Sequence, residues 1–129
     1  MTTPRVFISF DFDHDEDLRN LLVGQSKNDD SPFEITDWSL KEPLDGNWKE
    51  KIKPRIRSCH QMIVICGEHT ENAPGINHEI RVAQDEQKAY FLLYGRRDKD
   101  CKKPSAAKPS DKVYKWTWDN LKNLIGGFR

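Results

Sequence analysis

Short apolar runs and longer amphipathic stretches alternate along this chain. The runs predict strands at 6–10, 33–38, 61–66, 89–94 and 113–116. Between and after them, apolar residues that recur every three or four positions predict helices at about 13–26, 48–59, 76–87 and 117–125. The run at 61–66 (QMIVIC) is the most apolar of all, so we expect it to be the central strand of a sheet.

Strands that alternate with helices in this way predict an α/β fold. We expect a flavodoxin-like, doubly wound sheet of about five mostly parallel strands, with helices on both faces. A length of 129 residues suits one domain, which would span residues 1–129. The segment 96–112 is rich in Lys, Pro, Ala and Ser, and is interpreted as a mobile loop.

Composition and charge argue against several classes of protein. Basic and acidic residues balance at 21 each, which gives no global reason to bind nucleic acid or an anionic membrane. The sequence has no apolar run long enough to cross a membrane and no recognisable signal peptide, so we expect a cytoplasmic location. The three cysteines form no CxxC pair, which favours neither disulfides nor a zinc site, and Cys66 is expected to be a buried thiol.

The end of the first strand carries an unusual amount of negative charge. Five acidic residues fall within the seven positions 11–17 (DFDHDED). A metal could bind to Asp11, Asp13, His14 and Asp15, one acid could be a phosphoryl nucleophile, or the acids could begin a helix. FDFDHD contains both acids of the DxDxT/V phosphatase motif without its Thr or Val, and the third strand ends without the Asp that a phospho-receiver domain needs.

Helix initiation explains most of this charge. Asp13 or Asp15 can cap the helix, and acids in a first turn interact favourably with the helix dipole. In this interpretation Asp13, Asp15, Glu16 and Asp17 remain solvated, and Asp11 alone faces a pocket beyond the sheet. That pocket would lie at the carboxyl ends of the strands, where ligands of doubly wound folds bind.

Glu79 stands in the first turns of the helix that follows the third strand. A single carboxylate in a cleft beside aromatic side chains can stabilise an oxocarbenium-like centre, as in the cleavage of glycosidic bonds. A glutamate near a helix start can equally serve only the helix dipole. From residue type and position, both interpretations of Glu79 stay open.

Five segments of the chain together resemble the TIR-like domain family of bacterial Thoeris antiphage systems. They are RVFISFDFDHD, FEITDWSL, IRSCHQMIVICGEHT, GINHEIRVAQ and YKWTWDNL, and they span Arg5 to about Leu124. The resemblance implies a flavodoxin-like fold and an NAD+ nucleosidase or ADP-ribosyl cyclase activity, in which NAD+ is the substrate and no further cofactor is used. In Thoeris members it also implies a cyclic ADP-ribose-type messenger that activates a separate effector protein.

The same resemblance assigns the residues of a site. Glu79 matches the family's catalytic glutamate. Phe10 and Asp11 match the loop after the first strand, which lines the nucleotide pocket. Trp38 and Ser39 match the start of the loop after the second strand, which borders the site. No metal is required in such a site.

A second function stays open beside the cleavage of NAD+. Many catalytic TIR domains carry an aromatic and a small residue shortly before the glutamate, where this chain has GINH at 75–78. The alternative is a TIR-like module that assembles with itself or with another protein without turnover, through the basic segment 96–112 and the loop 39–47. A small hydrolase or phosphotransferase on the same fold is a third option.

Overall fold

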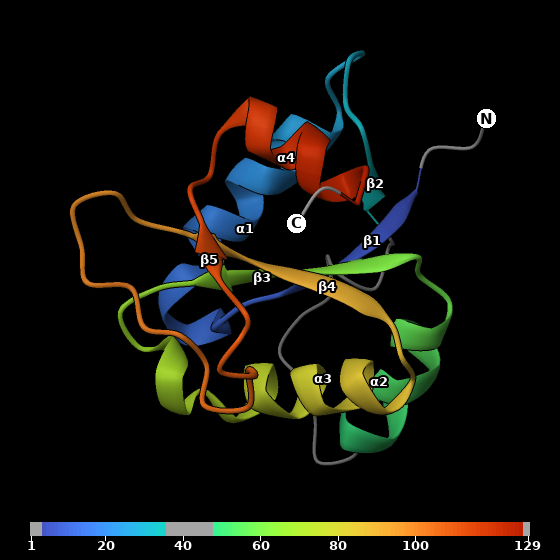
Figure 1. The fold of residues 1–129 in the computed structure, drawn as a ribbon, viewed down its shortest axis with the longest axis vertical. Coiled ribbons are helices and arrows are strands. Elements are labelled where there is room, and N and C mark those ends of the chain that lie inside the picture. Colours follow the sequence, from blue (N-terminus) through green and yellow to red (C-terminus); the bar gives the residue numbers. More distant parts are fainter. Residues whose placement is uncertain (1–3, 36–47, 128–129) are drawn as a thin grey trace.

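The computed structural model describes residues 4–35 and 48–127. In chain order its elements are β1 (Arg5–Ser9), α1 (Phe12–Ser26), β2 (Glu34–Ile35), α2 (Trp48–Arg57), β3 (Gln61–Cys66), the 3-10 turn η2 (Thr70–Asn72), α3 (Pro74–Asp85), β4 (Ala89–Tyr94), β5 (Val113–Tyr114) and α4 (Trp118–Ile125). Figure 1 shows the sheet in the middle, with helices above and below it. Each strand and helix predicted from the sequence corresponds to one of these elements.

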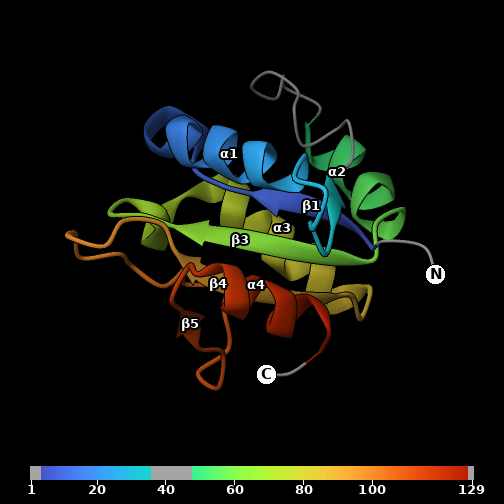
Figure 2. The same ribbon diagram turned by 90° about the horizontal axis from the view of Figure 1, so that it is seen from above.

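The five strands form one parallel sheet in the order β2-β1-β3-β4-β5. The central strand is β3, as predicted, and it pairs with β1 through Ile8 and Ile63 and with β4 through Ile63 and Phe91. Figure 2 shows β1, β3 and β4 side by side. The chain starts near the middle of the sheet and adds strands on both sides, which confirms the flavodoxin-like α/β fold.

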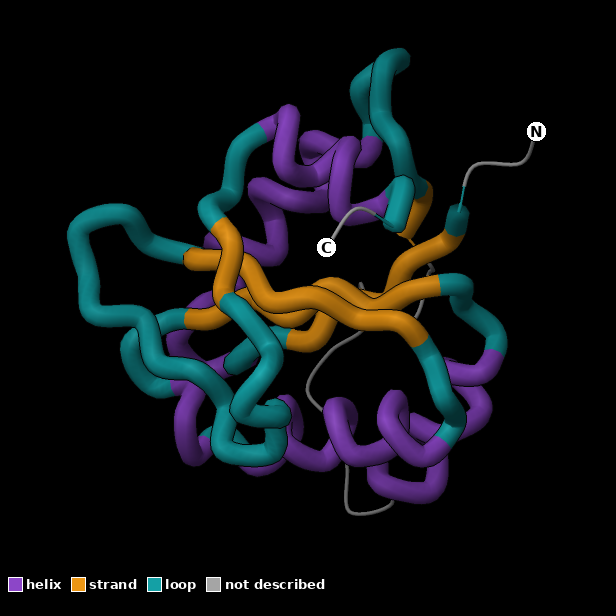
Figure 3. The backbone as a smooth tube through the Cα atoms, viewed as in Figure 1, coloured by secondary structure: helices purple, strands orange, loops and turns teal. Residues whose placement is uncertain are grey.

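Helices cover both faces of the sheet, α1 and α4 on one face and α2 and α3 on the other (Figures 1 and 3). Side chains alternate along β1, so this strand contributes to the hydrophobic core on both faces of the sheet. Val6 and Ile8 pack with α1 and α4, whereas Phe7 packs with α2 and α3. Ser9 is the next residue on the Phe7 side and is fully buried. The first strand is therefore buried on both faces of the sheet.

The starts of two helices depend on individual residues. Helix α3 begins at Pro74, two residues before its predicted start, because proline is favoured at a first helical position where no backbone N–H is needed. Thr117 caps α4 by accepting a hydrogen bond from the backbone N–H of Asn120. In the second predicted strand only Glu34–Ile35 is observed, and residues 36–38 lie outside the described part of the chain.

The segment between β4 and β5 differs from the mobile loop that its composition predicts. The backbone N–H of Lys102 donates to the carbonyl of Gly67 at 2.9 Å, and that of Ala106 donates to Oδ1 of Asn77 at 2.8 Å. Pro104 between them is buried. The segment is therefore held against α3 and the loop after β3, by long-range hydrogen bonds that composition does not predict.

Gly95 follows β4 at a point that leaves no room for a side chain. A Cβ atom there would lie 2.6 Å from Cδ1 of Leu18, 2.9 Å from the carbonyl oxygen of the buried Cys66 and 3.0 Å from Cγ2 of Ile65. Gly95→Ala is expected to lower the free energy of unfolding by about 2 kcal/mol, because overpacking forces these neighbours apart. Urea denaturation followed by tryptophan fluorescence measures the change.

Gly24→Ala is the matched control for this substitution. A Cβ atom at Gly24 meets nothing within 4 Å. Inside a helix alanine is favoured over glycine by about 0.5–1 kcal/mol, so this variant should be at least as stable as the parent. Equal unfolding midpoints for the two variants would contradict the close packing described at Gly95.

Candidate functional site

Glu79 lies on the buried face of α3. That face carries Ile76, Ile80 and Ala83, and Glu79 belongs to it because it stands three residues after Ile76. Its Oε1 accepts a hydrogen bond of 2.8 Å from Oγ of Ser9, the last residue of β1. Ser9 and Glu79 are 70 positions apart in the sequence. Their hydrogen bond joins β1 to α3 at the carboxyl edge of the sheet.

The Glu79 carboxyl is almost completely removed from water, since 6% of the residue is exposed. Burial raises the pKa of Glu79 to about 8, and the hydrogen bond from Ser9 and the positive charge of Arg55 oppose this rise only in part. The carboxyl is therefore largely protonated at neutral pH. A buried carboxyl whose pKa lies near the working pH can take up or release a proton during a reaction, and such groups are concentrated at functional sites.

Phe10 directly follows β1, but its ring lies on the other face of the sheet from Glu79. The ring packs against the residues under α1 and α4, and Cζ of Arg19 lies 5.6 Å from its centroid. Phe10 and Glu79 thus share the carboxyl edge of the sheet without sharing a face. Trp38 and Ser39, the other two residues of the predicted pocket wall, lie outside the described residues.

Asp11 is the residue that caps α1, so the prediction that Asp13 or Asp15 does so is wrong. Oδ1 of Asp11 accepts a hydrogen bond of 3.2 Å from the backbone N–H of Asp13, and Oδ2 lies 2.7 Å from Nδ1 of His14. The His14 ring stacks on that of His69, from the loop after β3, with centroids 3.9 Å apart. The cap falls this early because α1 starts directly after the strand, without a connecting turn.

Asp15 is buried, so the expectation that it stays solvated is also wrong. Its exposed fraction is 1%, and Oδ1 accepts a hydrogen bond of 3.2 Å from Arg96, in the loop after β4. Burial raises the pKa of Asp15, and Arg96 opposes that rise. The same guanidinium donates to the exposed Asp17 at 2.8 Å. A Cβ atom at Gly67 would lie 2.2 Å from Oδ2 of Asp15, so this carboxylate needs a glycine beside it.

Sequence reasoning missed Ser9, His69 and Arg96 as members of this edge. The sequence does point to Ser9, because a polar residue in an otherwise apolar strand requires a buried hydrogen-bond partner. Nothing in the sequence indicates that His69 stacks on His14. Nothing indicates the contacts of Arg96 either, since its partners Asp15 and Asp17 lie 81 and 79 positions away in the sequence.

The geometry does not favour a metal at the start of α1. Asp15 is turned to Arg96, and Asp11 binds His14 and the backbone of its own helix. Within residues 4–35 and 48–127, no three His, Cys, Asp or Glu side chains come together as metal ligands.

Comparison with known proteins agrees with the resemblance seen in the sequence. A family model described as the TIR-like domain of the Thoeris protein ThsB matches residues 7–100. The chain belongs to the Thoeris ThsB TIR-like family. The match contains Ser9, Glu79 and Arg96, and membership of the ThsB family supports a role in a defence system. No curated protein matches this ThsB-like chain. None of the helices described is long and apolar enough to span a membrane.

Proposed function

We propose that this ThsB-like chain cleaves NAD+ in antiphage defence. It would break the N-glycosyl bond, release nicotinamide and close the remainder into a cyclic ADP-ribose-type signal that activates a partner effector. The observation that carries the proposal is the Glu79 carboxyl, which is buried against Ser9 at the carboxyl edge of the sheet and has a pKa of about 8. Membership of the TIR-like family supports the proposal at a coarser level.

Departure of nicotinamide leaves positive charge on the ribose. The bond between C1′ and the pyridinium nitrogen breaks with its electron pair going to nicotinamide, so C1′ and the ring oxygen share a cationic charge. Glu79, once ionised, would stabilise that charge. Ser9 donates to Oε1 and would hold the carboxylate in place, with Oε2 directed to the ribose. An adenine nitrogen or a ribose hydroxyl of the same molecule would then bond to C1′ with loss of a proton, in a site from which water is excluded.

Four further residues belong to the proposed site. Phe10 or Trp38 would stack on a ring of the substrate, and Phe10 would meet only a part of NAD+ that extends past the edge to the other face of the sheet. Asp11 and Ser39 would border the nucleotide. In this scheme NAD+ is the substrate, and neither a bound cofactor nor a metal is part of the reaction.

Incubation of the purified chain with NAD+, followed by chromatography and mass spectrometry, tests the proposal. A product that has lost nicotinamide without gaining water identifies cyclisation, and one that has gained water identifies hydrolysis. Glu79→Gln keeps the size of the side chain and removes the charge, and is expected to lower nicotinamide release by about a hundredfold or more. Glu68→Gln, at an exposed position near the same edge, should leave it unchanged. Equal rates for the parent and Glu79→Gln would overturn the assignment.

The pH dependence of the reaction follows from the state of Glu79. With a pKa of about 8, the carboxyl must lose its proton before it can stabilise a cation. The value of kcat/KM is therefore expected to rise with pH and to level off above pH 8, because kcat/KM reports the ionisation of the free enzyme. A profile that is flat between pH 6 and pH 9 would contradict a role for the ionised carboxylate.

The second candidate function is a non-catalytic TIR-like module that assembles with itself or with another protein. The observation that favours it is the low exposure of Glu79, whose carboxyl already has a donor in Ser9. Nicotinamide release and light scattering, measured together over a range of protein concentrations, separate the two candidates. Assembly without release of nicotinamide at any concentration would favour the module.

A further inference from the structure

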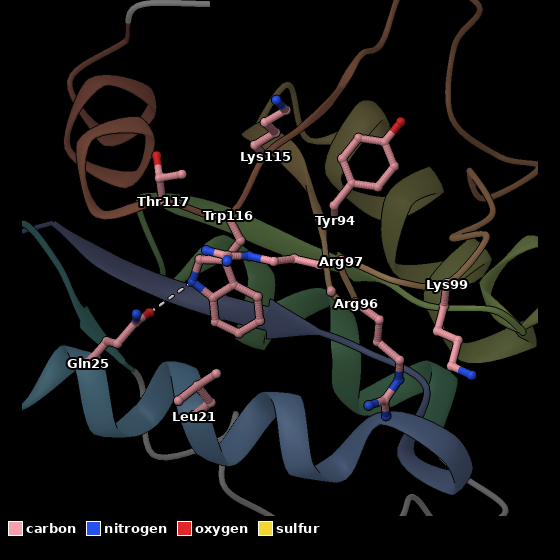
Figure 4. Close-up of a pocket in the computed structure, with 10 residues that line it drawn as sticks. Leu21, Gln25, Tyr94, Arg96, Arg97, Lys99, Lys115, Trp116 and Thr117 are labelled. Atoms are coloured by element: carbon pink, nitrogen blue, oxygen red, sulfur yellow. Dashed lines mark hydrogen bonds between the residues drawn. The ribbon is translucent and has the colours of Figure 1, made fainter.

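A cavity of about 840 Å3 lies on the face of the sheet that is covered by α1 and α4. Its walls come from the outer side of α1, from the end of β4 with the residues that follow it, and from residues 115–117 ahead of α4 (Figure 4). Small-molecule sites usually measure about 300–1,000 Å3. Glu79 belongs to α3, which covers the other face of the sheet, and neither Phe10 nor Asp11 lines this cavity.

The charged side chains among the described residues that line this cavity are all positive. They are Arg96, Arg97, Lys99 and Lys115, with no Asp or Glu among residues 4–35 and 48–127 at its wall. Arg96 is paired with acids of α1, but the other three cations have no ion-pair partner among the described residues. These three cations give the cavity a local positive charge, although the net charge of the whole chain is zero. The cavity is therefore suited to an anion.

Exposed apolar side chains gather at the same place. Within the described part of the chain, the large hydrophobic residues that stand out as exposed are Leu21 (56%) and Tyr94 (43%), and both line this cavity. Exposed apolar groups rimmed by polar ones are typical of a binding site.

Trp116 gives the cavity an aromatic surface held in a fixed orientation. Its Nε1 donates a hydrogen bond of 2.9 Å to Oε1 of Gln25 on α1, which fixes the plane of the indole (Figure 4). The ring lies among Leu21, Gln25 and the cationic side chains that follow β4. A tryptophan that is already hydrogen-bonded can stack on a flat ring without losing further conformational entropy.

We propose that this cavity binds a nucleotide-class anion, a flat base carrying at least two linked phosphates. Trp116 and Tyr94 take the base by stacking, and Arg97, Lys99 and Lys115 bind the phosphates with charge-assisted hydrogen bonds. The inference goes beyond the proposed cleavage of NAD+, because it concerns a second site whose described lining contains neither Glu79 nor Phe10 nor Asp11.

Titration of the 15N-labelled chain with ADP, adenosine and inorganic pyrophosphate tests the proposal. ADP is expected to shift the indole N–H signal of Trp116 and the backbone signals of Arg97 and Lys99, and to bind at least about tenfold more tightly than either fragment, because it uses both parts of the site. A Trp116 signal that does not move with ADP, or equal affinities for pyrophosphate and ADP, would overturn a nucleotide site.

A charge-matched pair of double variants separates local binding from general attraction. Arg97→Gln with Lys99→Gln removes two cations from the cavity wall and should weaken ADP binding by about tenfold or more. Arg81→Gln with Lys108→Gln removes the same charge from exposed positions elsewhere and should leave it unchanged. Equal weakening in both double variants would mean that ADP responds only to the overall charge, and would overturn the proposal.

The Glu79→Gln variant keeps this test independent of the proposed catalytic function. Glu79 does not line the cavity, so the shifts of Trp116 with ADP are expected to persist in that variant. If ADP still binds at Trp116 while neither the parent nor any variant releases nicotinamide, the proposed nucleotide site is supported and the proposal of NAD+ cleavage fails. Loss of the Trp116 shifts in Glu79→Gln would place ADP at the catalytic edge and overturn the second site.

Discussion

The free energy of unfolding of the parent protein is expected to fall by roughly 4 kcal/mol, relative to that of Glu79→Gln, as the pH rises from 5 to 8. The pKa of Glu79 is about 8 in the folded chain, against 4.5 as the ordinary value. At a pH between these two pKa values, the Glu79 carboxyl has lost its proton in the unfolded chain and keeps it in the folded chain. The folded state then binds more protons, so the stabilisation contributed by Glu79 is complete below pH 4.5 and is lost progressively as the pH rises to 8.

The comparison with Glu79→Gln isolates this one group. Glutamine has nearly the same shape, its carbonyl oxygen can still accept the hydrogen bond from Ser9, and it carries no titrating proton. Urea denaturation of both proteins at several pH values gives the difference directly, because contributions from other acids cancel. Glu68→Gln, at an exposed position, should follow the parent curve. Parallel curves for the parent and Glu79→Gln between pH 5 and pH 8 would show that the carboxyl is not buried as described.

Arg96→Gln is expected to destabilise the protein by about 3 kcal/mol at pH 7, because it leaves a buried carboxylate without its cation. The exposed fraction of Asp15 is 1%, and Arg96 is the donor to its Oδ1. Its Oδ2 has no hydrogen-bond partner within the described residues. Replacing Asp15 by Asn in the same chain removes the charge and should restore much of the loss.

The double-mutant cycle of Arg96→Gln and Asp15→Asn measures this coupling by urea denaturation. Arg97→Gln is the control, since Arg97 is exposed and takes part in no ion pair among the described residues, and its effect should stay within about 0.5 kcal/mol. Additive losses in the double variant would mean that Arg96 does not stabilise the protein through Asp15.

The sequence predicted β3 and β4, two of the three inner strands, to the residue because their signals are local. Both 61–66 and 89–94 are apolar runs with polar or glycine neighbours, and the structure ends β3 and β4 at those boundaries. The start of α4 was predicted at 117 for the same reason, because a helix start depends mainly on the residues next to it, and Thr117 caps the helix there. Local pattern also placed Glu79 on the third helix near the apolar Ile76 and Ile80, although it did not reveal that the Glu79 carboxyl is buried with them.

The contacts around the site were beyond the reach of local pattern. An acid in a first helical turn is usually solvated, and Asp15 is buried only because the loop after β4 brings Arg96 into contact with it. The order of the strands brings these two residues together, and no spacing in the sequence encodes that order. The same reason applies to segment 96–112. Its composition predicted a mobile loop, whereas hydrogen bonds to Asn77 and Gly67 hold its backbone in place.

The strand β5 limits how copies of this chain could associate. It ends one side of the sheet and contains only Val113–Tyr114. Two residues offer too few backbone donors and acceptors to template a strand from another molecule, and Lys115 adds charge directly after them. A filament built by adding strands across this border is therefore disfavoured, and any contact between subunits on this side would have to be made by side chains of helices and loops.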